Sequence, residues 1–230
     1  MTTRAGKAAP LTAPVEDYLK AVYELESAGQ PAETNAIAQL LAIAPASVSG
    51  MMKRLADQGL VAHERYRGAR LTAAGRRAAL KTLRRHRVLE AYLTRALGYS
   101  WDLVHDEAER LEHAASDELI DRMAEAIGEP DTDPHGAPIP KRDGSLRSRD
   151  VVPLSAVDEG REARVERVSD RSGEALRYLA QLGIVPGVVV RVSSREPFGG
   201  PIVLRVRNAS RSISPALATE IMVAQVRRRR

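Results

Sequence analysis

Apolar residues recur every three or four positions through most of the first 127 residues, and every second position in short runs near the C-terminus. The first spacing is typical of an amphipathic helix, and the second of a strand with one buried face. The chain therefore predicts a mainly α protein with a small β-rich part at its end. The Pro- and Gly-rich segment 128–149 predicts the connection between the two.

The first 72 residues predict a compact DNA-reading unit. Helices are expected over 14–27, 34–41 and 45–58, and the alternating segment 60–72 predicts a hairpin whose tip carries Arg67 and Gly68. Two short helices joined by a tight turn form a helix-turn-helix, and the hairpin would be its wing. The pattern thus predicts a winged helix-turn-helix.

Two longer helices and a set of strands should follow. We expect one helix over 73–97, ended by Gly98, and a second that runs without interruption from about Asp102 to Ile127. Beyond the connection, strands are expected over 164–168, 188–192, 202–206 and 221–224, with a helix over 173–182. This order predicts a C-terminal β barrel that is small and partly open.

Charge divides the chain into the same parts. The net charge is +6 over residues 1–85, −9 over 86–140 and +8 over 141–230. Such sign changes indicate a basic module for a polyanion and an acidic one for cations. The chain lacks cysteine, an apolar run of about 18 residues and an apolar secretory leader, so we expect a cytoplasmic protein without thiolate metal sites.

The basic N-terminal unit has candidate DNA contacts on two elements. In the predicted third helix they lie off the apolar stripe, and in the wing they surround the tip: Ser47, Ser49, Gly50, Lys53, Arg54, Arg65, Arg67 and Arg70. Serine and glycine would approach base edges, whereas the cations would contact phosphates. The alternative is an ordinary three-helix packing unit with a solvated basic face.

Imidazoles and carboxylates are concentrated in the acidic middle part. On a helix, His105, Glu109, Glu112 and His113 would share one narrow face, because successive residues are about 100° apart. His86 and Glu90 repeat the i, i+4 spacing on the preceding helix. The two groups predict metal binding, with a solvated acidic helix face and incidental histidines as the alternative.

The remaining histidines and the donor types narrow this hypothesis. His63 in the wing and His135 in the connection are interpreted as surface residues. Imidazole with carboxylate and no thiolate suits Mn(II), Fe(II), Co(II) or Zn(II), and a high share of carboxylate favours Mn(II). The sequence contains no His-Glu-x-x-His motif and no Gly-rich phosphate loop, so we expect no enzyme.

The order of these features resembles the diphtheria toxin repressor family of metal-dependent transcription regulators, and most of all its manganese-transport-regulator branch. The resemblance covers residues 15–226 and rests on the winged helix, His86-x3-Glu90, the run 104–113, and Asp133-Pro134-His135-Gly136 followed by Pro138-Ile139-Pro140. It implies a homodimer that binds palindromic operator DNA when loaded with metal and represses genes of metal homeostasis. The implied domains are a winged helix-turn-helix over 1–75, a helical dimerisation and metal-binding domain over 76–140, a linker over 141–155, and an SH3-like (FeoA-like) domain over 156–230.

The resemblance also assigns two metal sites. One would use His86, Glu90 and His105 with Asp170 from the C-terminal domain, and the other Asp17, Glu109, Glu112 and His113. Iron-responsive members have methionine and cysteine where this chain has Asp17 and Glu109, which favours oxygen ligands and Mn(II). The alternatives are an iron(II)-responsive repressor of the same family, a metal-independent DNA-binding protein and a metalloenzyme.

Overall fold

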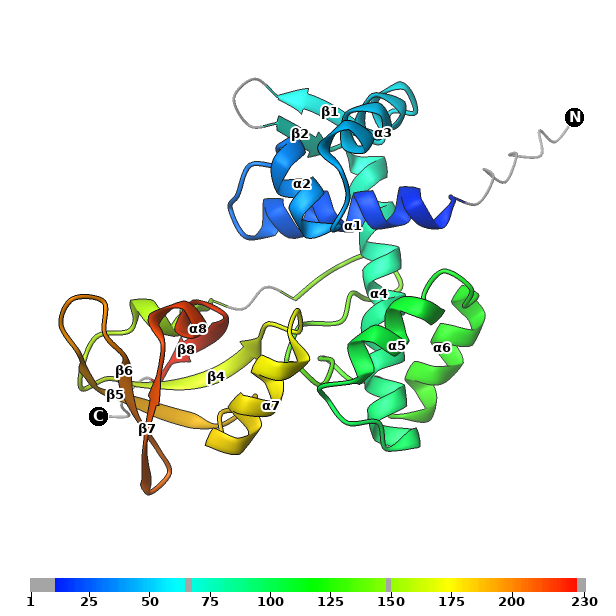
Figure 1. The fold of residues 1–230 in the computed structure, drawn as a ribbon. Helices are drawn as coiled ribbons and strands as arrows, with labels where there is room; N and C mark the ends of the chain where they lie inside the picture. The colour runs from blue at the N-terminus through cyan, green and yellow to red at the C-terminus, as the bar shows by residue number, and fades with distance from the viewer. Residues whose placement is uncertain (1–10, 65–67, 148–149, 227–230) are drawn as a thin grey trace, which may run out of the picture. The chain divides into compact units, whose positions relative to one another are not determined.

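The computed structural model describes residues 11–64, 68–147 and 150–226 (Figure 1). The chain forms two compact units. The first comprises residues 1–84 with 142–144, and the second comprises 85–141 with 145–230. The long helix α4, Ala73–Leu97, contributes residues to both units.

The first unit is a winged helix-turn-helix. Its elements are α1 (Ala13–Ser27), α2 (Thr34–Leu40), α3 (Pro45–Asp57), β1 (Val61–Glu64) and β2 (Gly68–Leu71). The bend between α2 and α3 is 109°, within the range of helix-turn-helix motifs. Leu19, Ile37, Val48 and Leu55 are fully buried, so the predicted apolar stripes meet in one core.

The wing is attached to the helices by its second strand. β1 and β2 pair antiparallel, with Val61 opposite Leu71 and Glu64 opposite Gly68. The backbone N–H of Leu71 donates to Oε1 of Glu26 in α1 at 2.9 Å. Gly68 has φ +71°, and a Cβ there would lie 2.3 Å from the carbonyl oxygen of Ala32, so this contact requires glycine.

The predicted helix over 102–127 is wrong in one respect, because it is two helices. α5 spans Val104–Leu111 and α6 spans Asp117–Ala126. The break falls at Ser116, whose hydroxyl accepts a hydrogen bond from the N–H of Leu119 and so caps α6. Glu112 is therefore the C-cap of α5, and His113 lies in the turn that follows it.

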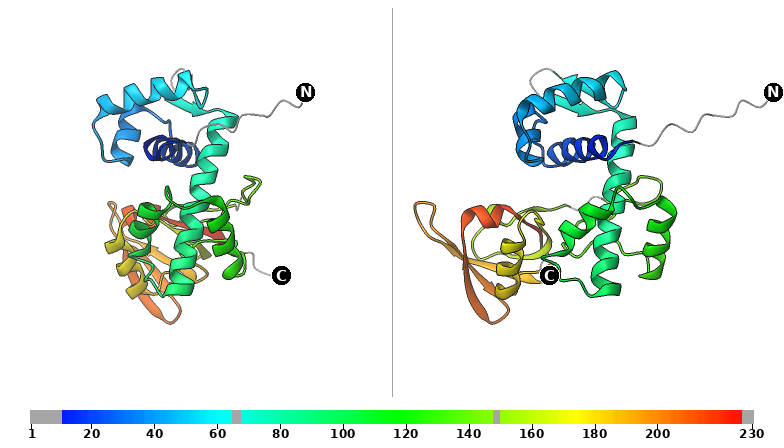
Figure 2. Two further views of the ribbon diagram at one scale, coloured as in Figure 1. Left: turned by 90° about the vertical axis from the view of Figure 1, so that its right-hand side faces the viewer. Right: turned by 45° about the vertical axis from the view of Figure 1, so that its right-hand side comes forward.

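The break also changes which side chains pack. Both α5 and α6 lie beside the C-terminal part of α4 (Figure 2). Val88 and Leu89 of α4 are packed with Ala108 of α5 and with Ile120 and Ala124 of α6. Three leucines of these helices, one of them at the start of the break, are exposed: Leu97 by 59%, Leu111 by 37% and Leu119 by 44%.

The C-terminal sheet holds six antiparallel strands. Its elements are β3 (Val152–Pro153), η1 (Leu154–Ala156), β4 (Glu162–Val168), α7 (Gly173–Leu182), β5 (Val189–Arg195), β6 (Ile202–Val206), β7 (Ala209–Ile213), α8 (Pro215–Thr219) and β8 (Ile221–Gln225). The strand order is β3-β8-β4-β5-β6-β7. Among the described residues β3 and β7 are unclosed edges, so the predicted β barrel is an open sheet. Its core includes Val165, Leu176, Leu204 and Val223.

The segment after α6 is packed and not a solvated connection. Ala137 and Ile139 are buried, and Ile139 contacts the core between α4 and α6. The interpretation of His135 as a surface residue is wrong, since its side chain is fully buried. Gly136, with φ +89°, approaches β4 so closely that a Cβ would lie 2.0 Å from the carbonyl oxygen of Glu166.

Within the described ranges, no single helix has the length and apolar character to cross a membrane. The bent pair α2 and α3 passes that test only when its two helices are counted together.

Candidate metal centre and DNA-binding face

Four side chains from three segments of the second unit converge. His86 and Glu90 lie one turn apart in α4, His105 lies in the first turn of α5, and Asp170 follows β4. Each offers one ligand atom, and these atoms all lie within 4.8 Å of one another. The resemblance had assigned these four residues to one site, and the fold brings them together.

The contacts centre on one oxygen of Glu90. Oε1 lies 3.0 Å from Nε2 of His86 and 3.2 Å from Nδ1 of His105. The two imidazole nitrogens are 3.1 Å apart, and Oδ2 of Asp170 is 3.6 Å from Nδ1 of His105. A divalent cation is the species that two imidazoles and two carboxylates bind together.

The other nitrogen of His86 indicates how its ring is oriented. Nδ1 lies 2.6 Å from Oε2 of Glu112, and both side chains are buried. A carboxylate accepts, so Nδ1 donates to Glu112, and Nε2 is the nitrogen that faces Glu90 and His105 and would bind a metal there. Carboxylate-held imidazoles of this kind are the usual metal-binding histidines.

The ionisation of these groups fits a site for cations. Burial by itself would raise the pKa of Glu90, but the charge of His86 and the nearby imidazoles of His105 and His135 hold that pKa well below its usual range. Burial would lower the pKa of His105, yet Glu90 and Asp170 raise it above the ordinary value. The carboxylate of Glu90 is therefore ionised and available at neutral pH.

The residues of the second predicted metal site come from α1, from α5 and from the turn after α5. Oε1 of Glu112 lies 3.5 Å from Nε2 of His113, so these two side chains meet in the turn after α5. Glu109 is half exposed, and its Oε1 lies 3.7 Å from Nε2 of His105. Asp17 lies in α1, in the first unit.

Two residues of the connecting segment were missed by sequence reasoning. Asp133 and His135 are buried, and with Glu90 they form a second group whose ligand atoms lie within 4.8 Å of one another. Nδ1 of His135 is 3.6 Å from Oε1 of Glu90. The sequence feature that could have indicated them is the Asp-x-His spacing just before Ala137 and Ile139, two apolar residues that are buried and hold the segment against the protein.

The pKa values of this group are strongly perturbed. Burial and the charge of Glu90 raise the pKa of Asp133 to about 7. Burial would lower the pKa of His135, but the carboxylates of Glu90 and Asp133 outweigh burial and raise it to about 9. The group therefore attracts positive charge.

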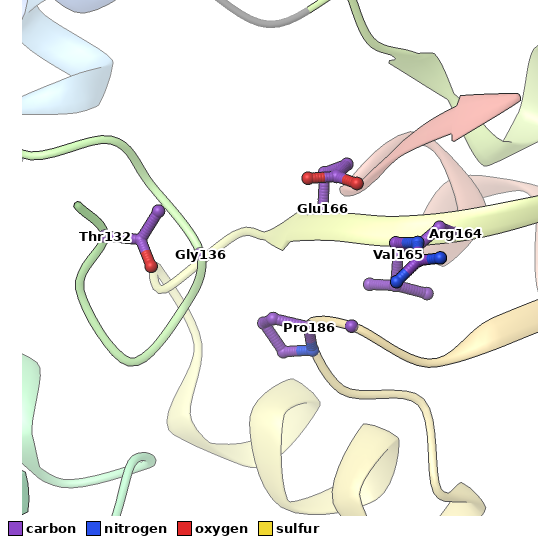
Figure 3. A pocket seen from close by; sticks show the side chains of 7 residues that line it. Thr132, Gly136, Arg164, Val165, Glu166 and Pro186 are labelled. Atoms are coloured by element: carbon purple, nitrogen blue, oxygen red, sulfur yellow. The ribbon is translucent and has the colours of Figure 1, made fainter. Parts of the chain in front are cut away.

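An open pocket of about 540 Å³ lies beside the same segment (Figure 3). Thr132 and Gly136 line one side, and Arg164, Glu166 and Pro186 line the other. The residues that line it do not include His86, Glu90, His105 or Asp170, which together are called the four-residue site below.

The predicted DNA contacts of α3 lie together on its exposed side. Ser47, Ser49, Gly50, Lys53 and Arg54 are all exposed, whereas Val48 and Leu55 are buried beneath them. Ala44 at the N-cap provides no side-chain cap for the first turn. Arg70 is exposed in β2, 3.8 Å from Glu26, and Arg65 and Arg67 lie outside the described residues.

Three protein-family models match the chain, one to each part. Residues 10–69 match the iron dependent repressor N-terminal DNA binding domain, and residues 72–141 match the iron dependent repressor metal binding and dimerisation domain. Residues 152–225 match the FeoA domain.

Individual proteins extend this likeness. The iron-dependent repressor IdeR of Mycobacterium leprae is 29% identical over 224 residues, covering 92% of this chain and 96% of that protein. The diphtheria toxin repressor of Corynebacterium jeikeium is 38% identical over 128 residues, and there the match spans about half of each, 56% of this chain and 53% of that protein. A solved manganese-dependent transcriptional repressor in complex with manganese has TM-score 0.88 and 38% identity, with 92% of this chain and all of that chain covered.

Proposed function

Because the chain belongs to the diphtheria toxin repressor family of metal-dependent transcriptional repressors, we propose that it is a Mn(II)-activated repressor of metal-homeostasis genes. The convergence of His86, Glu90, His105 and Asp170 carries this proposal. It acts as a homodimer on palindromic operator DNA in the cytoplasm, and it is not an enzyme. The organisation is 1–75 for DNA binding, 76–140 for dimerisation and metal, 141–155 as linker and 156–230 as the FeoA-type domain.

The choice of Mn(II) follows from the donor atoms. The two ligand sets offer only carboxylate oxygens and imidazole nitrogens, and the chain has no cysteine to provide a softer thiolate. Carboxylate-rich sites prefer the harder six-coordinate ions, of which Mn(II) is one. The manganese complex of the similar repressor supports this choice.

Iron(II) is the second candidate, supported by the likeness to IdeR along nearly its whole length. Co(II) and Zn(II) bind the same types of donor atom, and the experiment below compares how strongly each ion activates DNA binding.

Dimerisation is supported by apolar side chains that the described chain leaves exposed. Leu97, Leu103 and Leu119 are 59%, 58% and 44% exposed, and all lie in or near the helices matched to the dimerisation model. Exposed large apolar residues on helices that match a dimerisation model favour a protein interface there.

For a bound metal to control DNA binding, the winged helix-turn-helix unit must provide at least one of its ligands. We assign that role to Asp17, with Glu109, Glu112 and His113 as the remaining ligands of the second site. Metal held by both parts would select the arrangement of winged helices that fits two successive major grooves. A preference of about 3 kcal/mol for that state would raise operator affinity on the order of a hundredfold.

The test is a mobility shift with the DNA upstream of the protein's own gene. Binding is measured in chelator and then in Mn(II), Fe(II), Co(II) or Zn(II) at matched free-ion concentrations. The proposal expects strong activation by Mn(II). Equal binding in chelator would indicate a metal-independent DNA-binding protein, stronger activation by Fe(II) an iron regulator, and no binding together with substrate turnover a metalloenzyme.

A further inference from the structure

Three buried side chains beside the four-residue site offer ligand atoms within 4.8 Å of one another, and each has a polar atom with no hydrogen-bond partner among the described residues. These unpaired atoms are Oε2 of Glu90, Oδ2 of Asp133 and Nδ1 of His135. The three side chains are 0%, 5% and 0% exposed. Unpaired buried polar atoms are costly, so three on neighbouring side chains indicate a missing positive partner.

The orientation of each group is fixed by its other atoms. Nε2 of His135 lies 2.6 Å from the carbonyl oxygen of Trp101, which can only accept, so Nε2 carries a hydrogen. Oδ1 of Asp133 accepts from the N–H groups of His135 and Ala137, both at 2.9 Å, which leaves Oδ2 turned into the cluster. Without a metal the two carboxylates favour a proton on Nδ1, and a cation that displaces this proton would bind the Nδ1 lone pair.

The neighbouring positive charge does not satisfy these atoms. Nε of Arg87 is 3.6 Å from Oδ2 of Asp133, beyond hydrogen-bond distance, and another guanidinium nitrogen of Arg87 donates to the carbonyl of Pro138. A proton on Nδ1 of His135 can serve only one of the two carboxylate oxygens, so the other still has no partner. A divalent cation is attracted by all three at once.

We propose that Glu90, Asp133 and His135 bind a divalent cation of the Mn(II) type, next to the ion of the four-residue site, with the Glu90 carboxylate bridging the two. Oε1 of Glu90 faces His86 and His105 and lies 3.6 Å from Nδ1 of His135, while Oε2 is the unpaired atom. The donor set of one imidazole and two carboxylates suits the same class of ion. The proposal rests on the proposed function only through the shared ligand Glu90.

This ion would also connect the helical domain to the sheet. The carbonyl of His135 accepts from the N–H of Val168 in β4 at 3.0 Å, and its ring contacts the segment between α4 and α5 through Trp101. Filling the cluster would therefore fix the connecting segment to both.

The direct test is crystallography of the full chain grown with Mn(II), with the anomalous signal measured near the manganese edge. The proposal expects a peak between the Glu90 carboxylate, Oδ2 of Asp133 and Nδ1 of His135, in addition to the ions of the two predicted sites. A water molecule or empty density there, with the other ions present, would overturn the proposal.

The solution test counts bound Mn(II) per chain by equilibrium dialysis. Asp133→Asn is the sharpest variant, because asparagine keeps the oxygen that accepts both N–H bonds and replaces only the unpaired one. We expect three ions in the unmodified protein and two in this variant and in His135→Gln. His63→Gln, which changes the histidine of the wing, should keep all three.

Thermal unfolding in chelator distinguishes loss of the ion from loss of the fold. Asp133→Asn should unfold at the same temperature as the unmodified protein or higher, and should gain less stability from Mn(II). An unchanged ion count in both variants contradicts the proposal. Metal-activated operator binding is scored separately, so its absence would overturn the proposed function and leave the ion count standing.

Discussion

Nδ1 of His86 lies 2.6 Å from Oε2 of Glu112, and this contact joins the two predicted ligand sets through one imidazole. The same ring presents Nε2 to Oε1 of Glu90 at 3.0 Å. Glu112 in turn places its other oxygen 3.5 Å from His113. A change at Glu112 should therefore act on both sets.

Glu112→Gln should weaken Mn(II) binding at the four-residue site about 10- to 100-fold, because the amide no longer fixes the His86 ring as a carboxylate does. Isothermal titration with Mn(II) measures this. Asp17→Ala is the matched control, since it removes a predicted ligand of the second set only. Equal affinity of the four-residue site in both variants would count against the His86 contact.

Asp17→Ala should abolish metal-dependent operator binding while leaving Mn(II) bound at the four-residue site. The reason is that Asp17 is the ligand assigned to the DNA-reading unit. A mobility shift in Mn(II) and in chelator measures the effect, and Glu24→Ala in the same helix serves as control. Full activation by Mn(II) in the Asp17 variant would exclude that role.

Gly50→Ala should stabilise the protein and weaken operator binding. A Cβ at Gly50 would meet no atom within 4 Å, and alanine in a helix interior is favoured over glycine by about 1 kcal/mol. If DNA approaches this face, the added methyl group occupies that space. Thermal unfolding and a mobility shift give the two results, with Ala56→Ser near the end of α3 as control; unchanged affinity would place Gly50 away from the DNA.

The stability of the metal-free protein should fall as pH rises above 7. The folded state raises the pKa of His135 from 6.5 to about 9, so its contribution is complete below pH 6.5 and is lost as pH passes through 9. This shift amounts to about 3 kcal/mol at most. Asp133, whose pKa is raised from 3.8 to about 7, also makes stability fall as pH rises, but in the lower window between pH 3.8 and 7.

Urea unfolding in chelator at several pH values between 6.5 and 9.5 measures this decline. His135→Gln should give a flatter profile, whereas His63→Gln should keep the slope. The same slope in both variants would mean that His135 does not hold its proton more tightly in the folded protein.

Local periodicity predicted the elements whose burial is one-sided and continuous. α3, α4 and α7 begin and end within a residue of the expected positions, because their caps and glycines are local signals. The break between α5 and α6 was missed, since the run from Val104 to Ile127 has helical spacing throughout. Strands β3 and β7 were missed because they are short or polar, and only pairing with β8 and β6 defines them.

The sequence by itself determined the identity and spacing of the donors: His86 with Glu90 on one helix, His105 on the next, and no thiolate. Their i, i+4 spacing is a property of the helix and needs no tertiary contact. Tertiary structure alone decided that Asp170, after β4, lies beside these donors. It also decided that Glu112, at the end of α5, contacts His86, and that His135 is buried beside Glu90. These contacts join residues 26 to 84 positions apart in the chain, and only the packing of separate segments into one core brings them within a few ångströms.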